Sequence, residues 1–498
     1  MGINSSSGRV VVNSVIYTFS GLLLKCFSFF LLPLYTAYLT TKDYGITSIS
    51  NSFISTMSFV VTFSLFSAVM RFYVDLKDSP EKLKRFYGTI SLFSFLSGCV
   101  FFILFTLFRR QLSVYVFSGI DYYPVILVCL FSLIFSCQHT IFDNILRSQQ
   151  LALKSSILSI CFFLVTLILN LIFVVSFKMG ALGSLLSMLL AYIIYTVYFV
   201  VFMIKKGQIY YCLDLELLRE ALKYSVPIMP HNLSTQIALL ISKVLISGTT
   251  SLESLGIYSV ASQFGNIADT IQGYVDQAYG PWLYEKLHEK ENGFRKSIRE
   301  TARMLCAVIG LFFIGISLYS QDYILLFVHS DYVEAWKYVS FIVLVFAVKT
   351  MYYFYVEILF YYKRASKYLF TATLTSSLIN VILSYFLIGS MGVYGSILAD
   401  GLSMFIRVLI IVVISRRYDD IGLCVRDFLI NFFIIAVFMG VGLILSVYKY
   451  RDKFSLLNFG YKSVVILLYL VLIIVMNKNQ IGIAFEMFKN KFRRKSNK

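Results

Sequence analysis

Charged residues are scarce in this chain: only 14% of its 498 residues are Asp, Glu, Lys or Arg, whereas 58% are hydrophobic. A soluble domain carries about 25% charged residues. The apolar residues are spread along the whole chain, so one soluble core cannot bury them. The scarcity of charge therefore excludes a soluble globular protein and predicts a polytopic, all-α membrane protein.

The chain also lacks the motifs that several chemistries require. It has no Gly-rich phosphate loop ending in Lys-Ser or Lys-Thr, no His-Glu-x-x-His and no nucleophile elbow, which argues against an ATP-driven pump. Its eight cysteines show no metal-ligand spacing, so we interpret them as small buried hydrophobic residues and expect no metal or other cofactor. Most predicted outer loops are under about 15 residues, too short for a folded catalytic domain, and we expect a protein that is not an enzyme.

What the chain has instead is a regular series of apolar runs. The first run is long and lacks an Ala-x-Ala site, so we interpret it as a membrane helix and not as a cleaved signal peptide. About 20 residues cross the hydrocarbon. The runs predict fourteen helices, at 12–39, 44–72, 87–109, 121–147, 154–177, 181–204, 224–248, 254–284, 300–319, 335–362, 367–390, 393–415, 427–447 and 460–477.

Lysine and arginine fall mostly on one side of this layout. With the N-terminus in the cytoplasm, 30 of the 44 lie in cytoplasmic segments and 9 in outer segments. The positive-inside rule then predicts that both termini are cytoplasmic. It also accounts for the net charge of +18 without a nucleic-acid partner. We interpret the basic tail, Lys489–Lys495, as an anchor to the lipids of the cytoplasmic leaflet.

Two pairs of segments repeat about 210 positions apart. In the first pair, 170–184 and 380–396, an Asn precedes an apolar run that ends in Gly-x-x-Gly-Ser. In the second pair, 41–46 and 252–257, a short polar segment ends in Gly-Ile. We interpret the first pair as short outer turns between the fifth and sixth and the eleventh and twelfth helices. A repeat of this length indicates two homologous membrane lobes.

The repeat divides the chain into an N-terminal six-helix lobe (1–206), a cytoplasmic linker (207–223), a second six-helix lobe (224–418), and two extra helices with the tail (419–498). Because six is even, both lobes enter the membrane from the same side. Such parallel repeats are related by an axis along the membrane normal. A central cavity between them can open to either face by rocking, which is typical of transporters.

Five basic residues lie within the predicted spans, where ionisable groups are costly and indicate function. They are Lys25, Arg71, Lys243, Lys349 and Arg407. Lys25 and Lys243 lie on equivalent helices of the two lobes, so both can face the shared axis and attract an anion such as phosphate. The alternative for each is snorkelling to the interface, which we favour for Arg71 near a cytoplasmic helix end.

The acidic residues in the spans are Asp143, Asp269, Asp276, Glu357 and Asp400. Asp400 and Arg407 are seven apart on one helix and can pair, and Lys349 and Glu357 are within reach of one face. Asp269 has no basic neighbour on its own helix, which makes it the best candidate for a carboxylate that binds H⁺ or Na⁺. We predict ion coupling at Asp269, Glu357 and Asp400.

Two prolines, Pro227 and Pro230, stand at the start of the seventh predicted helix. A proline pair frees backbone carbonyls and can form a hinge. The alternative is simple helix initiation, because proline is tolerated in the first turn.

Four segments together resemble the polysaccharide flippases of the multidrug/oligosaccharidyl-lipid/polysaccharide (MOP) exporter superfamily, the Wzx-type translocases of O-antigen or capsular repeat units. They are Lys42–Ile46, Leu255–Ala261, Tyr361–Arg364 and Asn380–Ser396. The resemblance implies that the chain flips an undecaprenyl-pyrophosphate-linked oligosaccharide across the bacterial inner membrane. It also implies basic cavity residues from the early helices of each lobe, a role that Lys25 and Lys243 fit. In relatives an Asp often precedes the basic residue of the seventh helix; here Ser242 takes that place.

The resemblance implies a lipid-linked oligosaccharide substrate for O-antigen, lipopolysaccharide or capsule assembly, with a polysaccharide polymerase and chain-length machinery as partners. One alternative is a multidrug or cation antiporter of the same superfamily, which needs an acidic pocket. Another is a membrane glycosyltransferase or polymerase, which needs large outer loops. A non-transporting scaffold of an assembly complex also remains open.

Overall fold

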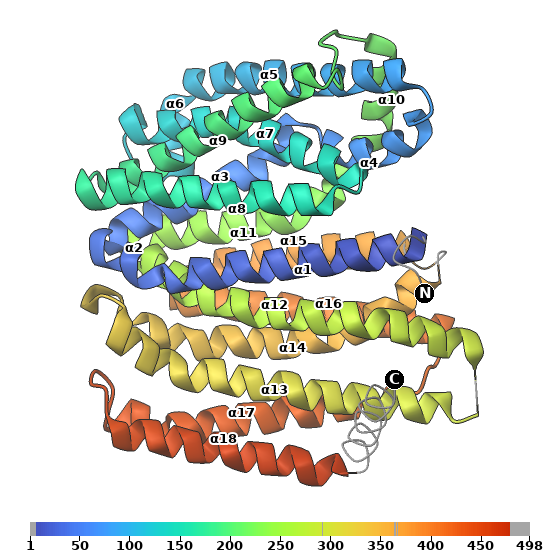
Figure 1. Ribbon diagram of the computed structural model, residues 1–498. Helices are drawn as coiled ribbons and strands as arrows, with labels where there is room; N and C mark the ends of the chain where they lie inside the picture. Colours follow the sequence, from blue (N-terminus) through green and yellow to red (C-terminus); the bar gives the residue numbers. More distant parts are fainter. Residues whose placement is uncertain (1–5, 291, 363–364, 366, 479–498) are drawn as a thin grey trace, which may run out of the picture. The chain divides into compact units, whose positions relative to one another are not determined.

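The computed structural model describes residues 6–290, 292–362, 365 and 367–478, and within these ranges every regular element is a helix (Figure 1). The elements are α1 (Ser6–Phe30), α2 (Leu32–Tyr38), α3 (Thr41–Val61), α4 (Leu65–Leu76), α5 (Pro80–Leu107), α6 (Arg109–Gln111), η1 (Leu112–Val116), η2 (Tyr122–Ile126), α7 (Leu127–Ser148), α8 (Ala152–Asn170), η3 (Leu171–Ser176), α9 (Gly180–Lys205), α10 (Leu215–Ser225), α11 (Met229–Thr249), α12 (Leu252–Glu289), α13 (Phe294–Phe327), η4 (Ser330–Tyr332), α14 (Ala335–Tyr361), α15 (Lys367–Met391), α16 (Val393–Tyr418), α17 (Val425–Tyr448) and α18 (Leu456–Met476).

The predicted all-α membrane fold is confirmed, although the count of fourteen spans stays a prediction. Of the described helices, 11 are long and apolar enough to cross a membrane, or up to 12 if the bent pair α3 and α4 forms one span. The remaining two expected spans correspond to α11 and α12, which are helical but fall outside this set. The long α12 carries acidic residues along its length, including Asp269 and Asp276, which lower its hydropathy.

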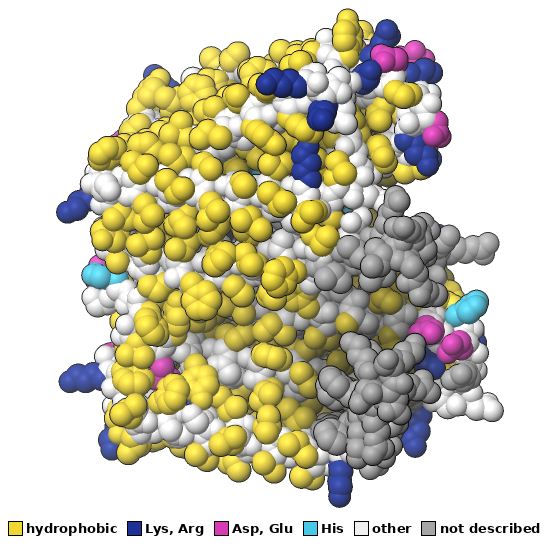
Figure 2. Space-filling model, in the orientation of Figure 1, with side chains coloured by type: hydrophobic (Ala, Val, Ile, Leu, Met, Phe, Trp, Pro, Cys, Tyr) yellow, Lys and Arg dark blue, Asp and Glu magenta, His cyan; other side chains and the backbone are white. Residues whose placement is uncertain are grey.

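Large hydrophobic side chains are exposed along the helices. Figure 2 shows them covering the sides of the helices, with Lys and Arg gathered toward the helix ends. Leu107, for example, is 74% exposed and Val475 is 68% exposed. Apolar surface on this scale is unfavourable in water and favourable against lipid tails.

The chain divides into two compact units, which we describe separately. One comprises Met1–Ser259 with Val381–Ser396, and the other comprises Val260–Asn380 with Ile397–Lys498. The boundaries fall within α12, α15 and α16, not in the predicted linker at 207–223. The six-plus-six-plus-two plan therefore stays a prediction from the repeat.

Helix α7 is the centre of the first unit. It packs against α3, α4, α5, α8 and α9. The span from Tyr122 to Ser148 that contains it is 67% buried, far more than the spans around it. Aromatic side chains fill the space between these helices, as where the rings of Phe142 and Phe199 stack with centroids 4.4 Å apart.

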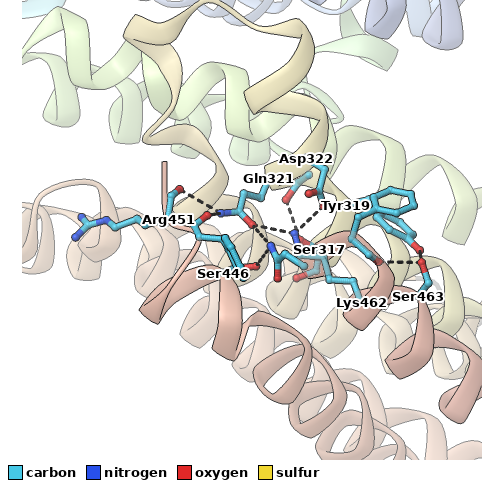
Figure 3. A network of polar contacts seen from close by, with 12 residues as sticks. Ser317, Tyr319, Gln321, Asp322, Ser446, Arg451, Lys462 and Ser463 are labelled. Carbon is cyan, nitrogen blue, oxygen red and sulfur yellow. Dashed lines mark hydrogen bonds and ion pairs between the residues drawn. The ribbon is translucent and has the colours of Figure 1, made fainter. Parts of the chain in front are cut away.

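Helix α13 has the same role in the second unit, where it packs against α14, α17 and α18. A buried polar network joins α13 to α18 (Figure 3). Lys462, which charge counting places at the outer surface, is fully buried, and its Nζ donates to Asp322 Oδ2 at 2.6 Å and to Gln321 Oε1 at 2.8 Å. Asn458 Nδ2 also donates to Gln321 Oε1 and to Ser446 Oγ.

The two Gly-x-x-Gly-Ser segments lie where one helix follows another: the first begins α9 at Gly180, and the second begins at Gly392, between α15 and α16. That these turns lie on the outer side of the membrane stays a prediction. Gly180 and Gly392 both adopt positive φ, +55° and +57°, a conformation that L side chains rarely adopt. The second glycine of each motif lets helices approach closely. A Cβ at Gly183 would lie 2.9 Å from the Phe173 carbonyl oxygen, and one at Gly395 would lie 2.1 Å from the Leu387 carbonyl oxygen.

The second repeated pair meets across a reciprocal contact. A Cβ on Gly45 would lie 2.0 Å from the Leu252 carbonyl oxygen, and a Cβ on Gly256 would lie 1.9 Å from the Thr41 carbonyl oxygen. Each glycine thus accommodates the backbone of the other copy. This is the pattern of an interface around a two-fold axis, in which each copy uses the same surface.

Asp43, two residues before Gly45, fixes the start of α3. It forms a capping box with Thr40, which satisfies backbone N–H groups that a helix start leaves open. Its other oxygen, Oδ1, accepts a hydrogen bond from the Ala181 backbone N–H at 3.0 Å. The motif at 41–46 is therefore structural: it ties α3 to the first turn of α9.

Candidate functional site

Lys243 lies in a cluster of hydroxyl groups at the repeat contact. Its side chain projects from α11, and Nζ donates to Ser52 Oγ at 2.7 Å and to Ser48 Oγ at 3.0 Å, both on α3. The Ser48 and Ser259 hydroxyl oxygens are 2.7 Å apart. Among the described residues, the hydrogen-bond partners of Lys243 Nζ are hydroxyl and carbonyl oxygens, and none of them is a carboxylate.

Lys25 has a different environment from Lys243. It is exposed on α1, which packs against α8, whereas α11 packs against α3. The two lysines thus lie on helices with different neighbours. That both face one cavity stays a prediction.

Arg71 forms a surface ion pair with Asp75 one turn along α4. The closest atoms are 3.3 Å apart, and the side chains are 56% and 46% exposed. Exposed pairs of this kind contribute little stability. The geometry agrees with the snorkelling alternative for Arg71.

Asp269 is not isolated, because a different helix supplies its cation. Lys349 Nζ, on α14, donates to Asp269 Oδ1 at 2.6 Å, and the Tyr353 hydroxyl donates to the same oxygen at 3.1 Å. The pair is partly exposed, at 19% for the Lys349 side chain and 37% for that of Asp269. The reasoning from helix α12 alone missed this partner, since contacts between helices do not follow from spacing along one helix.

Glu357 contacts α12, whereas the basic residue on its own helix, Lys349, pairs with Asp269. Its Oε2 accepts a hydrogen bond from the Tyr284 hydroxyl on α12, and a Cβ on Gly280 of the same helix would lie 2.9 Å from that oxygen. Glu357 is only 7% exposed. The Glu357 carboxyl group is therefore buried against α12.

Arg407 and Asp400 each bond to α15. Arg407 Nε donates to Ser376 Oγ at 2.7 Å. Asp400 Oδ1 accepts from Asn380 Nδ2 at 2.7 Å, and Asn380 also donates to Ser403. Asn380, which opens the second repeat segment, thus links α15 to α16.

The two prolines lie at a break between helices. Helix α10 ends at Ser225, and α11 begins at Met229 with Pro230 in its first turn. Proline at that position removes no intrahelical hydrogen bond. This placement agrees with helix initiation, and a hinge at Pro227 and Pro230 stays a prediction.

The Tyr-Tyr-Lys-Arg segment follows α14. The Tyr362 hydroxyl donates to Asp419 Oδ2 at 2.7 Å, and burial together with this carboxylate raises the pKa of Tyr362 to about 12. Lys363 and Arg364 lie outside the described residues, as does the predicted lipid anchor at Lys489–Lys495.

No role was predicted from the sequence for several polar residues that contact the candidate site. Ser48 and Ser259 are 211 positions apart, as are Gly45 and Gly256, so the repeat offset itself was a signal for their contact. For Gln272, Asp276 and Tyr284, helix α12 carries no motif. Their role emerges only from the packing of α12 against α14.

Two cavities lie in the second unit. The smaller, of about 10 Å³, is bounded by Gln272, Asp276, Tyr279, Thr350 and Tyr353, together with three apolar residues. The larger, of about 200 Å³, lies between α13, α17 and α18 and contains the Arg299–Asp427 ion pair but none of the predicted site residues.

The fold resembles that of known flippases and transporters. The lipid II flippase MurJ, in an inward closed conformation, matches with a TM-score of 0.70 and 17% identity over 94% of this chain and 100% of MurJ. An inward-facing MATE multidrug transporter of the MOP superfamily gives 0.55 and 14% identity over 86% of this chain and 98% of its own. A MOP-superfamily transporter from Pyrococcus furiosus gives 0.52 and 15% identity over 82% of this chain and 95% of its own.

At these identities the structural matches show the fold alone. No curated protein sequence matches this chain significantly. The family described as "polysaccharide biosynthesis protein" matches residues 10–286, more than half of the chain. The chain is therefore a multi-pass membrane protein that belongs to the polysaccharide biosynthesis protein family and has the MOP-superfamily transporter fold.

Proposed function

We propose that this protein is a flippase for an undecaprenyl-pyrophosphate-linked oligosaccharide repeat unit in O-antigen, capsule or other surface polysaccharide assembly. It acts by alternating access in the bacterial inner membrane, with both termini cytoplasmic. It performs transport and no covalent chemistry. In this proposal the lobes at 1–206 and 224–418 move relative to each other during transport. The linker at 207–223 joins them, and two helices and a tail follow at 419–498.

The observation that carries the proposal is the environment of Lys243, in a family of polysaccharide biosynthesis proteins. The Lys243 ammonium group is half-buried, and its described partners are only hydroxyl and carbonyl oxygens, so no described carboxylate neutralises it. A cation within a membrane bundle is costly and indicates function. The pyrophosphate of a lipid-linked sugar carries the complementary charge.

The test is to replace Lys243 in cells that depend on this protein for surface polysaccharide. We expect Lys243→Met to lower export at least tenfold and to accumulate lipid-linked repeat unit on the cytoplasmic side. Lys243→Arg, which keeps the charge, should retain part of the activity. Lys449→Met, at an exposed site after α17, is the matched control and should export normally. Normal export by Lys243→Met at normal protein level would refute the role of Lys243.

Deleting the whole protein tests the function itself. We expect loss of surface polysaccharide and accumulation of the lipid-linked intermediate. Unchanged polysaccharide without an intermediate would exclude a flippase and favour a scaffold. The MATE likeness supports a second candidate, a multidrug antiporter, but Lys243, which has no carboxylate partner within the described part of the chain, is unsuited to cationic drugs.

The partners and the ion coupling in this proposal are predictions from the sequence. The partners are membrane lipids, a polysaccharide polymerase and chain-length machinery. The energy source is an H⁺ or Na⁺ gradient, without a bound cofactor, acting through Asp269, Glu357 and Asp400.

A further inference from the structure

The cavity of about 200 Å³ between α13, α17 and α18 changes character along its length (Figure 1). One end is lined by four charged side chains, which are Arg299, Arg303, Arg426 and Asp427. The other end is apolar and includes Ile434, eight residues further along α17 than Arg426. Eight helical residues span about 12 Å. The cavity therefore joins a charged end to an apolar end.

The charged end has an excess of positive charge. Arg299 donates from Nε to Asp427 Oδ2 at 2.6 Å and from Nη2 to Asp427 Oδ1 at 3.0 Å, so one guanidinium group engages both carboxylate oxygens. Arg303 and Arg426 are exposed, and neither forms an ion pair with any residue that the structure describes. Two guanidinium groups thus remain for an anion, and their planar donors suit phosphate oxygens.

The apolar end opens onto the lipid-facing surface. Ile434, Leu472 and Ile473 line this end. Ile430 and Met476 also line the cavity, and they are 43% and 44% exposed. An apolar cavity of about 150 Å³ in a soluble protein holds a benzene molecule. The present cavity therefore has room for several carbons of an acyl chain that enters from the bilayer.

The two ends together set the chemistry of the occupant, which must carry a negative charge next to an apolar chain. The arginines lie at helix ends that the charge count predicts to be cytoplasmic. Anionic phospholipids of the cytoplasmic leaflet bind to basic pockets between membrane helices. They combine a phosphate with acyl chains, and the leaflet around the protein supplies them at high local concentration.

We propose that this cavity binds one anionic phospholipid. Its phosphate contacts Arg303 and Arg426, and one acyl chain lies along the apolar end beside Ile434. The Arg299–Asp427 pair joins α13 to α17 at the charged end and keeps the carboxylate from competing with the phosphate. This inference goes beyond the proposed function and does not depend on it, because the binding is measured without transport.

Native mass spectrometry of the purified full-length protein in detergent tests the site. The probes are phosphatidylglycerol and phosphatidylcholine with the same acyl chains, added in equal amounts. We expect the wild type to retain one phosphatidylglycerol molecule with at least a tenfold preference. Arg303→Gln with Arg426→Gln should lose this preference. Equal binding of the two lipids by the wild type, or an unchanged preference in the double variant, would overturn the proposal.

A matched control removes two charges elsewhere. Lys205 and Lys206 are exposed at the end of α9 and do not line the cavity. Lys205→Gln with Lys206→Gln should keep the tenfold preference. If the control loses the preference as the arginine variant does, the lipid responds to overall charge, and the site proposed here is wrong.

A second variant leaves all three arginines in place and tests the acyl chain. Ile434→Trp puts a larger side chain into the apolar end and should reduce the bound phosphatidylglycerol at least tenfold. Undiminished binding would show that no chain occupies the cavity, and it would overturn the proposal. This variant keeps the test decisive if the double arginine variant fails to fold.

Two competitors distinguish the possible sources of the phosphate. Inorganic phosphate at millimolar concentration should leave the phosphatidylglycerol bound, because it has no acyl chain. Its displacement of the lipid would indicate an anion site only. Undecaprenyl phosphate should bind no more tightly than phosphatidylglycerol. Binding at least tenfold tighter would identify the occupant as a polyprenyl carrier, and either of these results would overturn the phospholipid assignment.

Discussion

Replacing Lys462 by Met should destabilise the second unit strongly. Lys462 is fully buried, and its partner Asp322 is 3% exposed, with 2.6 Å between Nζ and Oδ2. Removing one partner of a buried pair costs about 3–5 kcal/mol, because the other charge stays buried and uncompensated. Gln321 Oε1 also loses a donor at 2.8 Å, although Asn458 still donates to it. We therefore expect a loss of at least about 3 kcal/mol.

The assay is the apparent melting temperature of the purified protein in detergent. Membrane proteins often unfold irreversibly, so the comparison is made at one heating rate. Lys449→Met is the control and should melt like the wild type. The double variant Lys462→Met with Asp322→Leu should recover most of the loss, because replacing a whole buried pair by apolar residues is often neutral. If Lys462→Met melts like the wild type, or the double variant is worse than the single one, the pair is not the source of stability that we infer.

Three further predictions concern the first unit. Gly45→Ala should lower the apparent melting temperature and expression, because its Cβ would lie 2.0 Å from the Leu252 carbonyl oxygen, which a backbone shift must relieve; wild-type behaviour would show that the contact is loose. The double variant Ser48→Cys with Ser259→Cys should form a disulfide under mild oxidation, because the native hydroxyl oxygens are 2.7 Å apart. To detect the disulfide, the chain is cleaved between the two positions and run on a gel without reductant. Two separate fragments on that gel would contradict the contact. Arg71→Ala should change stability by less than about 0.5 kcal/mol and leave export unchanged. Lost export at normal protein level would instead support a cavity role for Arg71.

Sequence periodicity and composition predicted the helices well, for a physical reason. A lipid-facing helix must be apolar over its whole length and must satisfy its own backbone, so each span is visible in the sequence. The exceptions are α11 and α12, which are less apolar than the other spans. Asp269, Asp276 and Lys243 lie on these two helices, so the weakest membrane signals coincide with most of the candidate site.

The partners of the ionisable residues were much harder to predict. Spacing along one helix tells which residues share a face, and it led to Lys349 being considered with Glu357. The structure pairs Lys349 with Asp269 on another helix, because the choice of partner depends on which helices pack together. The buried Lys462 shows the same limit, since its position near a helix end suggested an outer surface.

The contact between Ser48 and Ser259 bears on how a chain of this length arose. Had the two repeats once been identical subunits of a homodimer, a residue on the axis would have met its own copy and so had to complement itself. A serine hydroxyl does this because it both donates and accepts, and Gly45 and Gly256 do so by leaving room for each other. Lysine does not, because two ammonium groups would repel. At the same offset the counterpart of Lys243 is Leu32. In a homodimer, the positions beside the axis would carry either two lysines or none. Joining the halves into one polypeptide removes that restriction and permits a single positive charge there.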